Sequence, residues 1–267
     1  MARRHGTASE QADDTASGAN APEDEPVAGT QPNPEFERVT SLFERVLEKE
    51  NLLQALRQVR RNRGAPGVDG MSVDELSGYL KDHWLGIKDE LLHERYRPQA
   101  VKRVEIPKPD GRQCKLGIPT VLDRFIQQAI NQVLQRVYEP MFHPHSYGFR
   151  PGRSAHQAVR HARAQVKAGW GWVVDLDLAA FFDRVNHDRL MHRLKQKIDD
   201  PALLRLIGRF LRAGVQIGEH VEPTREGVPQ GARSPRCWPT WYLTNSIRSL
   251  PGAAIALSAT PTTATSL

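Results

Sequence analysis

The most constraining feature of this sequence is a short apolar stretch that carries two carboxylates. Residues Val173–Asp183 include Asp175 and Asp177 among valines, leucines and phenylalanines. Side chains alternate between the two faces of a strand, so the two aspartates share one face and the apolar residues between them take the other. A carboxylate is costly to bury unless it is paired or holds a metal ion. The pattern therefore predicts either a metal-holding strand end or a half-exposed edge strand whose acids are solvated.

Charge and cysteine content narrow the class of protein. The chain of 267 residues has a formal net charge of +6, and a basic surplus favours a polyanionic partner because phosphate neutralisation dominates nucleic-acid affinity. The two cysteines, Cys114 and Cys237, lie far apart, which argues against a disulfide framework and against a cysteine-rich zinc site. With no run of 18 apolar residues and no apolar signal core, we expect a cytoplasmic protein without a membrane span.

Composition and periodicity divide the chain. Residues 1–35 contain no Leu, Ile, Phe, Tyr or Trp, so we expect a disordered tail, since such a segment buries too little apolar surface to offset its ordering entropy. Helical spacing begins at Phe36, and residues 36–100 are predicted to form a helical extension. Residues 101–231 contain the strands and motifs, and residues 232–267 change abruptly in composition.

Apolar periodicity and turn residues predict the individual elements. The predicted strands are a hairpin of Val101–Ile106 and Gln113–Ile118, a strand over Trp172–Leu178, and a hairpin within Val215–Val228. The predicted helices cover Val39–Leu47, Leu52–Val59, a stretch starting near Val73 with Ser72 as N-cap and Glu75 completing a capping box, Leu122–Tyr138, Ala155–Lys167, Asp188–Ile198 and Ala202–Ala213. His187 is interpreted as a capping or packing residue rather than a metal ligand.

Five runs of residues together resemble group II intron-encoded reverse transcriptases and stand in the family's order. They are Arg63–Gly70, then Ile106–Gly111 with Leu116–Arg124, then Ser146–Ser154, the Asp177 segment, and Gly227–Gly231. The resemblance covers about residues 45–231. It implies an α+β fold, with the fingers and part of the palm of a right-hand polymerase within residues 101–231.

The resemblance also implies the catalytic chemistry. Asp177 matches the family's first metal-binding aspartate, and the Leu178 carbonyl is expected to help hold the second ion. Two Mg²⁺ ions then assist phosphoryl transfer, and they prefer hard oxygen ligands. Asp175 shares the face but matches no ligand, so we expect a supporting role. Phe182, five residues after Asp177, is expected to pack under the nucleotide sugar and exclude a 2′-hydroxyl; a core position is the alternative, and Phe181 can exchange roles with it.

Nucleotide-binding residues follow from the same resemblance. Gln230 matches the glutamine that lies near the incoming nucleotide. Lys108, Arg112 and Lys115 lie on or beside the predicted hairpin, where cations would bind the triphosphate. The family's usual arginine two residues before the Leu-Gly-Ile-Pro run is Cys114 here, so nucleotide affinity depends on Arg112 or Lys115 as a substitute.

Other arginines are predicted to contact RNA through its phosphates. Arg60, Arg61 and Arg63 precede a glycine-rich loop and are expected to touch intron RNA or template. Arg150 and Arg153 flank a glycine-proline turn and are expected to touch the template backbone. The implied partners are group II intron RNA, an RNA template, a DNA primer and a deoxynucleoside triphosphate.

The residues after Gly231 depart from the family pattern. None of the chain's 31 acidic residues lies between Ala232 and Leu267. Read one base out of register, the possible codons from Gly231 onward can spell Gly-Pro-Leu-Ser-Pro-Leu-Leu-Ala-Asn, the family continuation. Those of Ala259–Thr265 can spell Tyr-Ala-Asp-Asp-Cys-Asn-Ile, which contains the family's second carboxylate motif. We therefore hypothesise a truncated, frameshifted chain that lacks ligands for two Mg²⁺ ions and is inactive in primer extension.

Two other interpretations stay open. The fingers and N-terminal helices could form an RNA-binding module without chemistry. The chain could also come from a retron or a diversity-generating reverse transcriptase, although the Arg63–Gly70 loop and the Leu116–Arg124 run favour the intron type.

Overall fold

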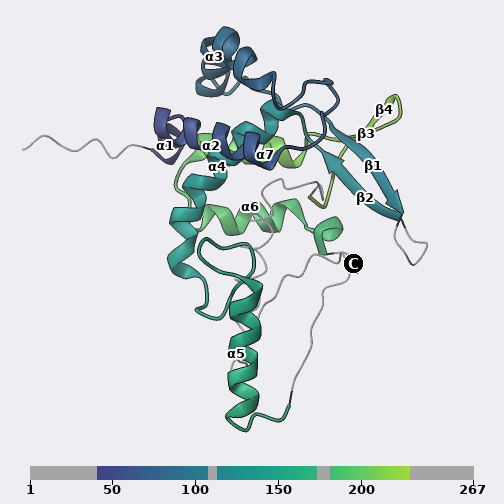
Figure 1. Ribbon diagram of the computed structural model, residues 1–267. Coiled ribbons are helices and arrows are strands. Elements are labelled where there is room, and N and C mark those ends of the chain that lie inside the picture. Colours follow the sequence, from purple (N-terminus) through teal and green to yellow (C-terminus); the bar gives the residue numbers. More distant parts are fainter. Residues whose placement is uncertain (1–40, 108–112, 173–180, 229–267) are drawn as a thin grey trace, which may run out of the picture. The chain divides into compact units, whose positions relative to one another are not determined.

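The computed structural model describes residues 41–107, 113–172 and 181–228, which form a mixed α+β structure (Figure 1). Its strands are β1 (Val101–Pro107), β2 (Gln113–Ile118), β3 (Val215–Ile217) and β4 (His220–Glu222). Its helices are α1 (Leu42–Val46), α2 (Lys49–Asn62), α3 (Leu76–Leu92), α4 (Val121–Tyr138), α5 (Ala155–Lys167), α6 (His187–Lys195) and α7 (Pro201–Leu211), with short 3-10 helices η1 (Glu139–Met141) and η2 (Phe181–Arg184).

The four strands form one mixed sheet in the order β2-β1-β3-β4. Strands β1 and β2 are an antiparallel hairpin that pairs Lys102 with Ile118 at one end and Pro107 with Gln113 at the other. Strand β3 lies parallel to β1, and β4 returns antiparallel to β3. The sheet therefore joins two hairpins that are about 100 residues apart in the chain.

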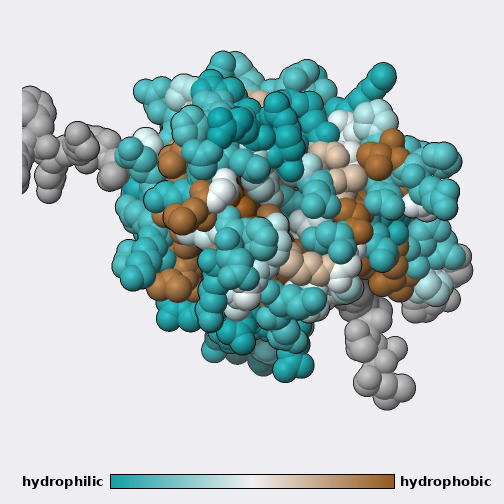
Figure 2. Space-filling view, turned by 90° about the horizontal axis from the view of Figure 1, so that it is seen from above, coloured by the Kyte–Doolittle hydropathy of each residue, from teal (hydrophilic) through white to brown (hydrophobic). Residues whose placement is uncertain are grey.

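Helix α4 forms the centre of the hydrophobic core. Its residues Ile126, Ala129, Ile130 and Leu134 are buried almost completely, as expected from apolar side chains that recur at helical spacing. Helices α1 and α2 pack against α4, and α6 and α7 add the buried side chains of Leu190, Leu194, Leu203 and Ile207. The face shown in Figure 2 is largely hydrophilic, with hydrophobic side chains visible between polar ones.

Buried polar side chains fix how the helices meet. Gln132 of α4 donates to the backbone carbonyl and side-chain oxygen of Asn51 on α2, at 2.9 and 2.8 Å. The Asn51 amide in turn donates to the carbonyls of Val46 and Ala129. Because a buried amide is costly without partners, this network sets one register of α2 against α4.

Most predicted elements are confirmed, with differences at their ends. Helix α5 has the predicted bounds, and α4, α6 and α7 differ from theirs by a few residues. The predicted capping box at Ser72 is wrong: Ser72 does bond to the Glu75 carboxylate, but within a turn, and α3 begins only at Leu76. The predicted hairpin of Val215–Val228 is shorter and ends at Glu222.

Three predicted segments lie outside the described residues: the tail 1–35, most of the strand over Trp172–Leu178, and the segment 232–267. Among the helices that the structure describes, none has both the length and the apolar character needed to cross a bilayer.

Candidate functional site

The glycine-rich loop Arg63–Gly70 lies directly on the start of α4. A Cβ atom added to Gly67 would lie 2.6 Å from the Cα and 2.7 Å from the backbone nitrogen of Thr120. Thr120 is the N-cap of α4, and its side chain accepts a hydrogen bond from the Asp123 backbone N–H. Only glycine fits this backbone-to-backbone approach. Two of the sequence motifs thus form one structural unit.

The Arg124 side chain also holds the Arg63–Gly70 loop against α4. Its guanidinium donates to the backbone carbonyls of Arg63 and Ala65, at 3.4 and 2.8 Å. Burial lowers the pKa of the Arg124 guanidinium, and the nearby Asp69 carboxylate opposes that shift. The side chain therefore holds the loop in place by hydrogen bonds.

Replacing Gly67 with alanine is expected to lower the free energy of unfolding by about 2 kcal/mol, because the added methyl group overpacks a rigid backbone contact. Gly86 on α3 is the matched control, since an added Cβ meets nothing within 4 Å there. Gly86→Ala is expected to stabilise the chain by roughly 0.5–1 kcal/mol, because alanine loses less backbone entropy in a helix. Urea unfolding followed by circular dichroism measures both changes. Equal effects of the two substitutions would contradict the close approach at Gly67.

Asp123 is a buried carboxyl group beside this contact. It accepts hydrogen bonds from the Tyr96 hydroxyl at 2.8 Å, the Thr120 hydroxyl at 2.8 Å and the Gln99 backbone N–H at 3.1 Å. Burial raises the pKa of Asp123 to about 6, although these three hydrogen bonds favour the charged form and oppose the shift. The carboxylate ties the segment after α3 to the start of α4.

The raised pKa of Asp123 predicts a pH dependence of stability. The folded chain holds this proton up to about pH 6, whereas the unfolded chain releases it near its ordinary value of 3.8. The stability from this group is therefore present below about pH 4 and lost as the pH rises through 6, a change of roughly 2–3 kcal/mol. Urea unfolding between pH 4 and 7 should show this loss in the wild type and not in Asp123→Asn. Parallel pH profiles for the two proteins would argue against the raised pKa.

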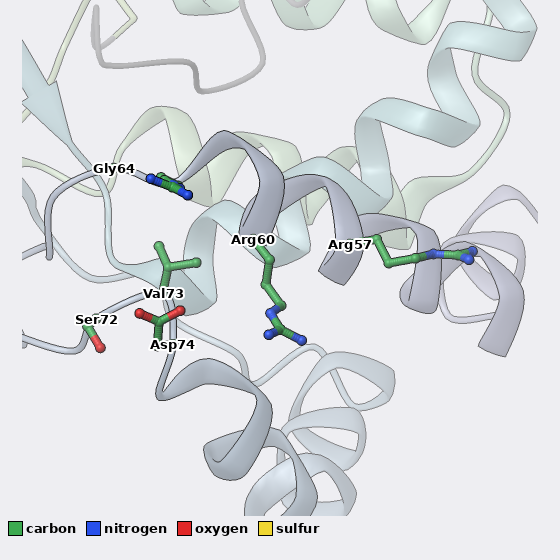
Figure 3. A pocket seen from close by; sticks show the side chains of 7 residues that line it. Arg57, Arg60, Gly64, Ser72, Val73 and Asp74 are labelled. Carbon is green, nitrogen blue, oxygen red and sulfur yellow. The ribbon is translucent and has the colours of Figure 1, made fainter.

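A basic hollow of about 640 Å³ lies between α2 and the segment before α3. Figure 3 shows Arg57 and Arg60 on one side of it and Ser72, Val73 and Asp74 on the other. Arg63 and Gly64 complete the lining. The lining contains three arginines and a single aspartate, so the hollow has a surplus of positive charge.

The hollow includes two of the five arginines predicted to contact RNA. Arg60 and Arg63 line it, whereas Arg61 is exposed but not part of the lining. Arg57 was missed by the sequence reasoning, although it lies three residues before Arg60 and so on the same face of a helix.

Arg150 is bonded within the protein. Its guanidinium donates to the Glu139 carboxylate at 2.8 and 3.0 Å and to the carbonyls of His143 and Ser146 at 2.9 and 2.8 Å. It also lies 5.0 Å from the Phe142 ring centre, and its side chain is only 7% exposed. Arg150 thus holds the loop after η1, and this geometry does not favour the predicted template contact.

Arg153 differs from Arg150 in its exposure. It is exposed, with its guanidinium 5.7 Å from the Tyr147 ring centre. Its contact with template stays a prediction.

On the β1–β2 hairpin, Lys115 is exposed and pairs across the strands with Glu105. Cys114, which replaces the family's usual arginine, pairs with Ile106. Lys108 and Arg112 lie outside the described residues, so Lys115 is the described member of the predicted nucleotide-binding set on this hairpin.

Two motif-bearing segments, Phe182–His187 and Gly227–Val228, meet at a junction. We call it the palm junction, because the family resemblance predicts a palm for this part of the chain. The Val228 N–H donates to the Phe182 carbonyl at 2.7 Å, and the Gly227 N–H donates to the Val185 carbonyl at 2.8 Å. His187 is buried, and its Nε2 atom lies 2.7 Å from the Gly227 carbonyl oxygen. His187 is therefore a packing residue, as predicted.

Gly227 is indispensable to the palm junction for steric reasons. Its φ angle is +80°, and an added Cβ would lie 2.8 Å from the Asp183 carbonyl oxygen and 3.1 Å from that of Phe182. The segment that follows the predicted catalytic strand is thus held against the residues that precede Gln230. Phe182 itself is half-buried and has contacts with its neighbours.

Comparison with known proteins decides the family. Residues 106–251 match the family described as reverse transcriptase (RNA-dependent DNA polymerase), which is more than half of the chain. This chain belongs to the reverse transcriptase family. The match includes β2, α4, α5 and the palm junction, while the hollow on α2 precedes it. It also runs to residue 251, beyond the change of composition at Gly231.

Curated relatives place this reverse transcriptase near the group II intron-encoded proteins. Protein YkfC of Escherichia coli (strain K12) is 36% identical over 211 residues, which cover 76% of this chain and 54% of YkfC. The group II intron-encoded protein LtrA of Lactococcus lactis subsp. cremoris is 33% identical over 193 residues, which cover 72% of this chain and 32% of LtrA. The chain thus spans about half of YkfC and a third of LtrA.

Solved structures support the fold of a reverse transcriptase. A chain of the structure described as a partial Cas6-RT-Cas1–Cas2 complex matches with a TM-score of 0.53 at 19% identity. The match covers 78% of this chain and 34% of that chain. At this identity the likeness supports the fold alone.

The predicted magnesium ligands of this reverse transcriptase, Asp177 and the Leu178 carbonyl, lie outside the described residues, as do Asp175 and Gln230. Within residues 41–107, 113–172 and 181–228, no cluster of three His, Cys, Asp or Glu side chains is arranged to hold a metal ion. The metal site therefore stays a prediction that rests on the family resemblance.

Proposed function

We propose that this chain is the fingers and first part of the palm of an RNA-directed DNA polymerase of the group II intron type. The palm junction is the observation that carries the proposal. Its hydrogen bonds join the residues just after Asp177 to those just before Gln230. These are the two segments that must converge if one side chain is to hold Mg²⁺ while the other lies near the incoming nucleotide.

The proposal gives each residue of the site a role. Asp177 and the Leu178 carbonyl would hold two Mg²⁺ ions, of which one would activate the primer 3′-hydroxyl and the other would neutralise the departing pyrophosphate. Lys108, Arg112 and Lys115 would bind the triphosphate, with Gln230 near the nucleotide. Phe182 would lie under the sugar, and its backbone is already fixed by the bond from Val228.

The hollow on α2 supplies the RNA-binding part of the proposal. Its lining contains Arg57, Arg60 and Arg63 but only one carboxylate, that of Asp74, and guanidinium groups bind phosphate in a bidentate manner. We assign this hollow, with the neighbouring Arg61, to the phosphates of intron RNA or template. The relative LtrA is itself described as group II intron-encoded.

We further propose that the chain is read out of frame after Gly231 and is inactive as it stands. The absence of acidic residues from Ala232 to Leu267 supports this proposal, because a second carboxylate motif is needed to hold two ions. Sequencing of the coding DNA checks it directly: the alternate frame should encode Tyr-Ala-Asp-Asp near Ala259.

Primer extension on an RNA template with Mg²⁺ tests the activity. The protein with its frame restored after Gly231 should synthesise cDNA, and the chain of 267 residues should not. If the restored protein makes no cDNA, the polymerase assignment is wrong. If the present chain makes cDNA, the proposed inactivity is wrong.

The second candidate function is an RNA-binding remnant without chemistry, which the basic hollow and the missing carboxylates both favour. It predicts that the restored protein binds RNA but extends no primer, so the same experiment separates the two candidates.

A further inference from the structure

A second group of arginines lies on α7 and directly after it, and none of them is among the predicted site residues. Arg205, Arg209 and Arg212 follow one another at intervals of four and three residues, a spacing that places side chains on one helix face. Arg97, from the segment after α3, lies close enough to Arg209 for their charges to interact. We call these four residues the α7 arginine cluster.

One carboxylate organises this cluster. Glu94 accepts two hydrogen bonds from Arg205, both at 2.5 Å, and lies 3.9 Å from an Nη atom of Arg209. Its backbone adopts a φ angle of +57°, a strained conformation for a residue with a side chain. Glu94 therefore positions Arg205 and Arg209, but its single charge balances only one of them.

The positive charge of the cluster is not neutralised within the described part of the chain. Asp200 also acts on Arg205, but both its oxygens accept backbone N–H bonds, from Phe43 and Leu203. No described carboxylate pairs with Arg97 or Arg212. At least two positive charges of the cluster remain without a counter-charge.

The geometry of α7 keeps these charges together. The Arg209 side chain is only 19% exposed, and its pKa is lowered first by burial and then by its neighbours Arg97, Arg205 and Arg212. Arg212 curls back along the helix, with a guanidinium nitrogen 3.1 Å from where a Cβ of Gly208 would lie. Like charges repel, so gathering four arginines around the single paired carboxylate of Glu94 is costly unless an anion binds there.

We propose that the α7 arginine cluster is a second RNA-contacting surface, which binds consecutive phosphates of one RNA strand. From Arg205 to Arg212 the backbone rises about 10 Å along the helix axis, so the cluster is long enough to contact more than one phosphate of an RNA strand. Guanidinium groups match phosphate by paired donors. This inference rests on the proposed RNA-binding function and adds a surface that shares no residue with the hollow on α2.

Salt-dependent RNA binding tests the cluster. The whole chain is titrated with an RNA hairpin at several salt concentrations, with the double substitution Arg97→Gln/Arg212→Gln and a matched control, Arg160→Gln/Arg163→Gln on α5. All four arginines are exposed, and both double variants lose two charges. The cluster variant should show a slope of log affinity against log salt that is smaller by about 1.5. The control slope should stay unchanged.

Four other outcomes would contradict the inference, and each has a different meaning. Equal slope changes in both variants would mean that only net charge matters. An unchanged cluster variant that still binds through the hollow would refute the second surface and leave the proposed function intact. No RNA binding by the unsubstituted chain would refute both. Competition by polyglutamate as strong as by RNA at equal charge would identify an acidic protein as the partner instead.

Discussion

Replacing Gly227 with alanine is expected to lower the free energy of unfolding by about 3 kcal/mol, one of the largest single effects in this chain. The new Cβ would lie 2.8 Å from the Asp183 carbonyl oxygen, on a residue whose φ angle is +80°. Relief would require the backbone to move, and the Val228 N–H to Phe182 carbonyl bond holds that backbone. Strain and steric overlap therefore add at this position.

Substitution of Gly218 separates the conformational strain from the steric overlap. Its φ angle is +60°, but an added Cβ meets nothing within 4 Å. Gly218→Ala should cost only the conformational strain, about 1 kcal/mol. Urea unfolding curves of the two variants measure the difference. If both lose the same stability, the close packing of the palm junction is not a source of stability.

The helices were the most predictable part of this fold. Helix α5 has its predicted bounds, and local residues account for them: Ser154 and Gln157 form a capping box at its start, and Gly169, just after its end, has a φ angle of +94°. Helix α4 was predicted from apolar residues that share one face, and the structure buries most of them. Caps and apolar periodicity were therefore sufficient to predict helices whose bounds are set by their own residues.

Contacts between distant segments could not be predicted in the same way. The residues near β3 contain no signal that it lies parallel to β1. The residues near Gly67 likewise contain no signal that it lies against Thr120. The motif pattern marked Gly67 and Gly227 as members of family runs, but the reason for glycine is a neighbour that is more than 40 residues away. Sequence spacing alone does not supply such neighbours.

The arginines show a further limit of prediction from sequence. In sequence, Arg150 and Arg153 have similar surroundings, yet one is nearly covered by Glu139 and two carbonyls while the other is exposed. Charge can be counted from a sequence, whereas neutralisation requires the positions of partners. For this reason the hollow was predicted only in part and the α7 arginine cluster was not predicted at all.

Replacing Asp177 with alanine in the frame-restored protein is expected to reduce primer extension by about 10³-fold or more. Removing a carboxylate ligand costs several kcal/mol of metal-based transition-state stabilisation, and each 1.36 kcal/mol is about tenfold in rate. RNA affinity should not change, because the proposed RNA contacts are arginines on α2 and α7. Primer extension and RNA titration of the same preparation measure the two properties.

Asp82→Ala is the matched control, since Asp82 is an exposed carboxylate on α3, outside the proposed site. It should retain full synthesis. Raising the Mg²⁺ concentration should leave the Asp177 variant inactive, because the missing ligand also positions the ion relative to the nucleotide. If Asp177→Ala synthesises cDNA normally, Asp177 does not hold a catalytic metal ion, and the polymerase assignment loses its predicted metal ligand. Loss of RNA binding together with synthesis would instead indicate that Asp177 supports the fold, since a metal ligand need not affect arginines on other elements.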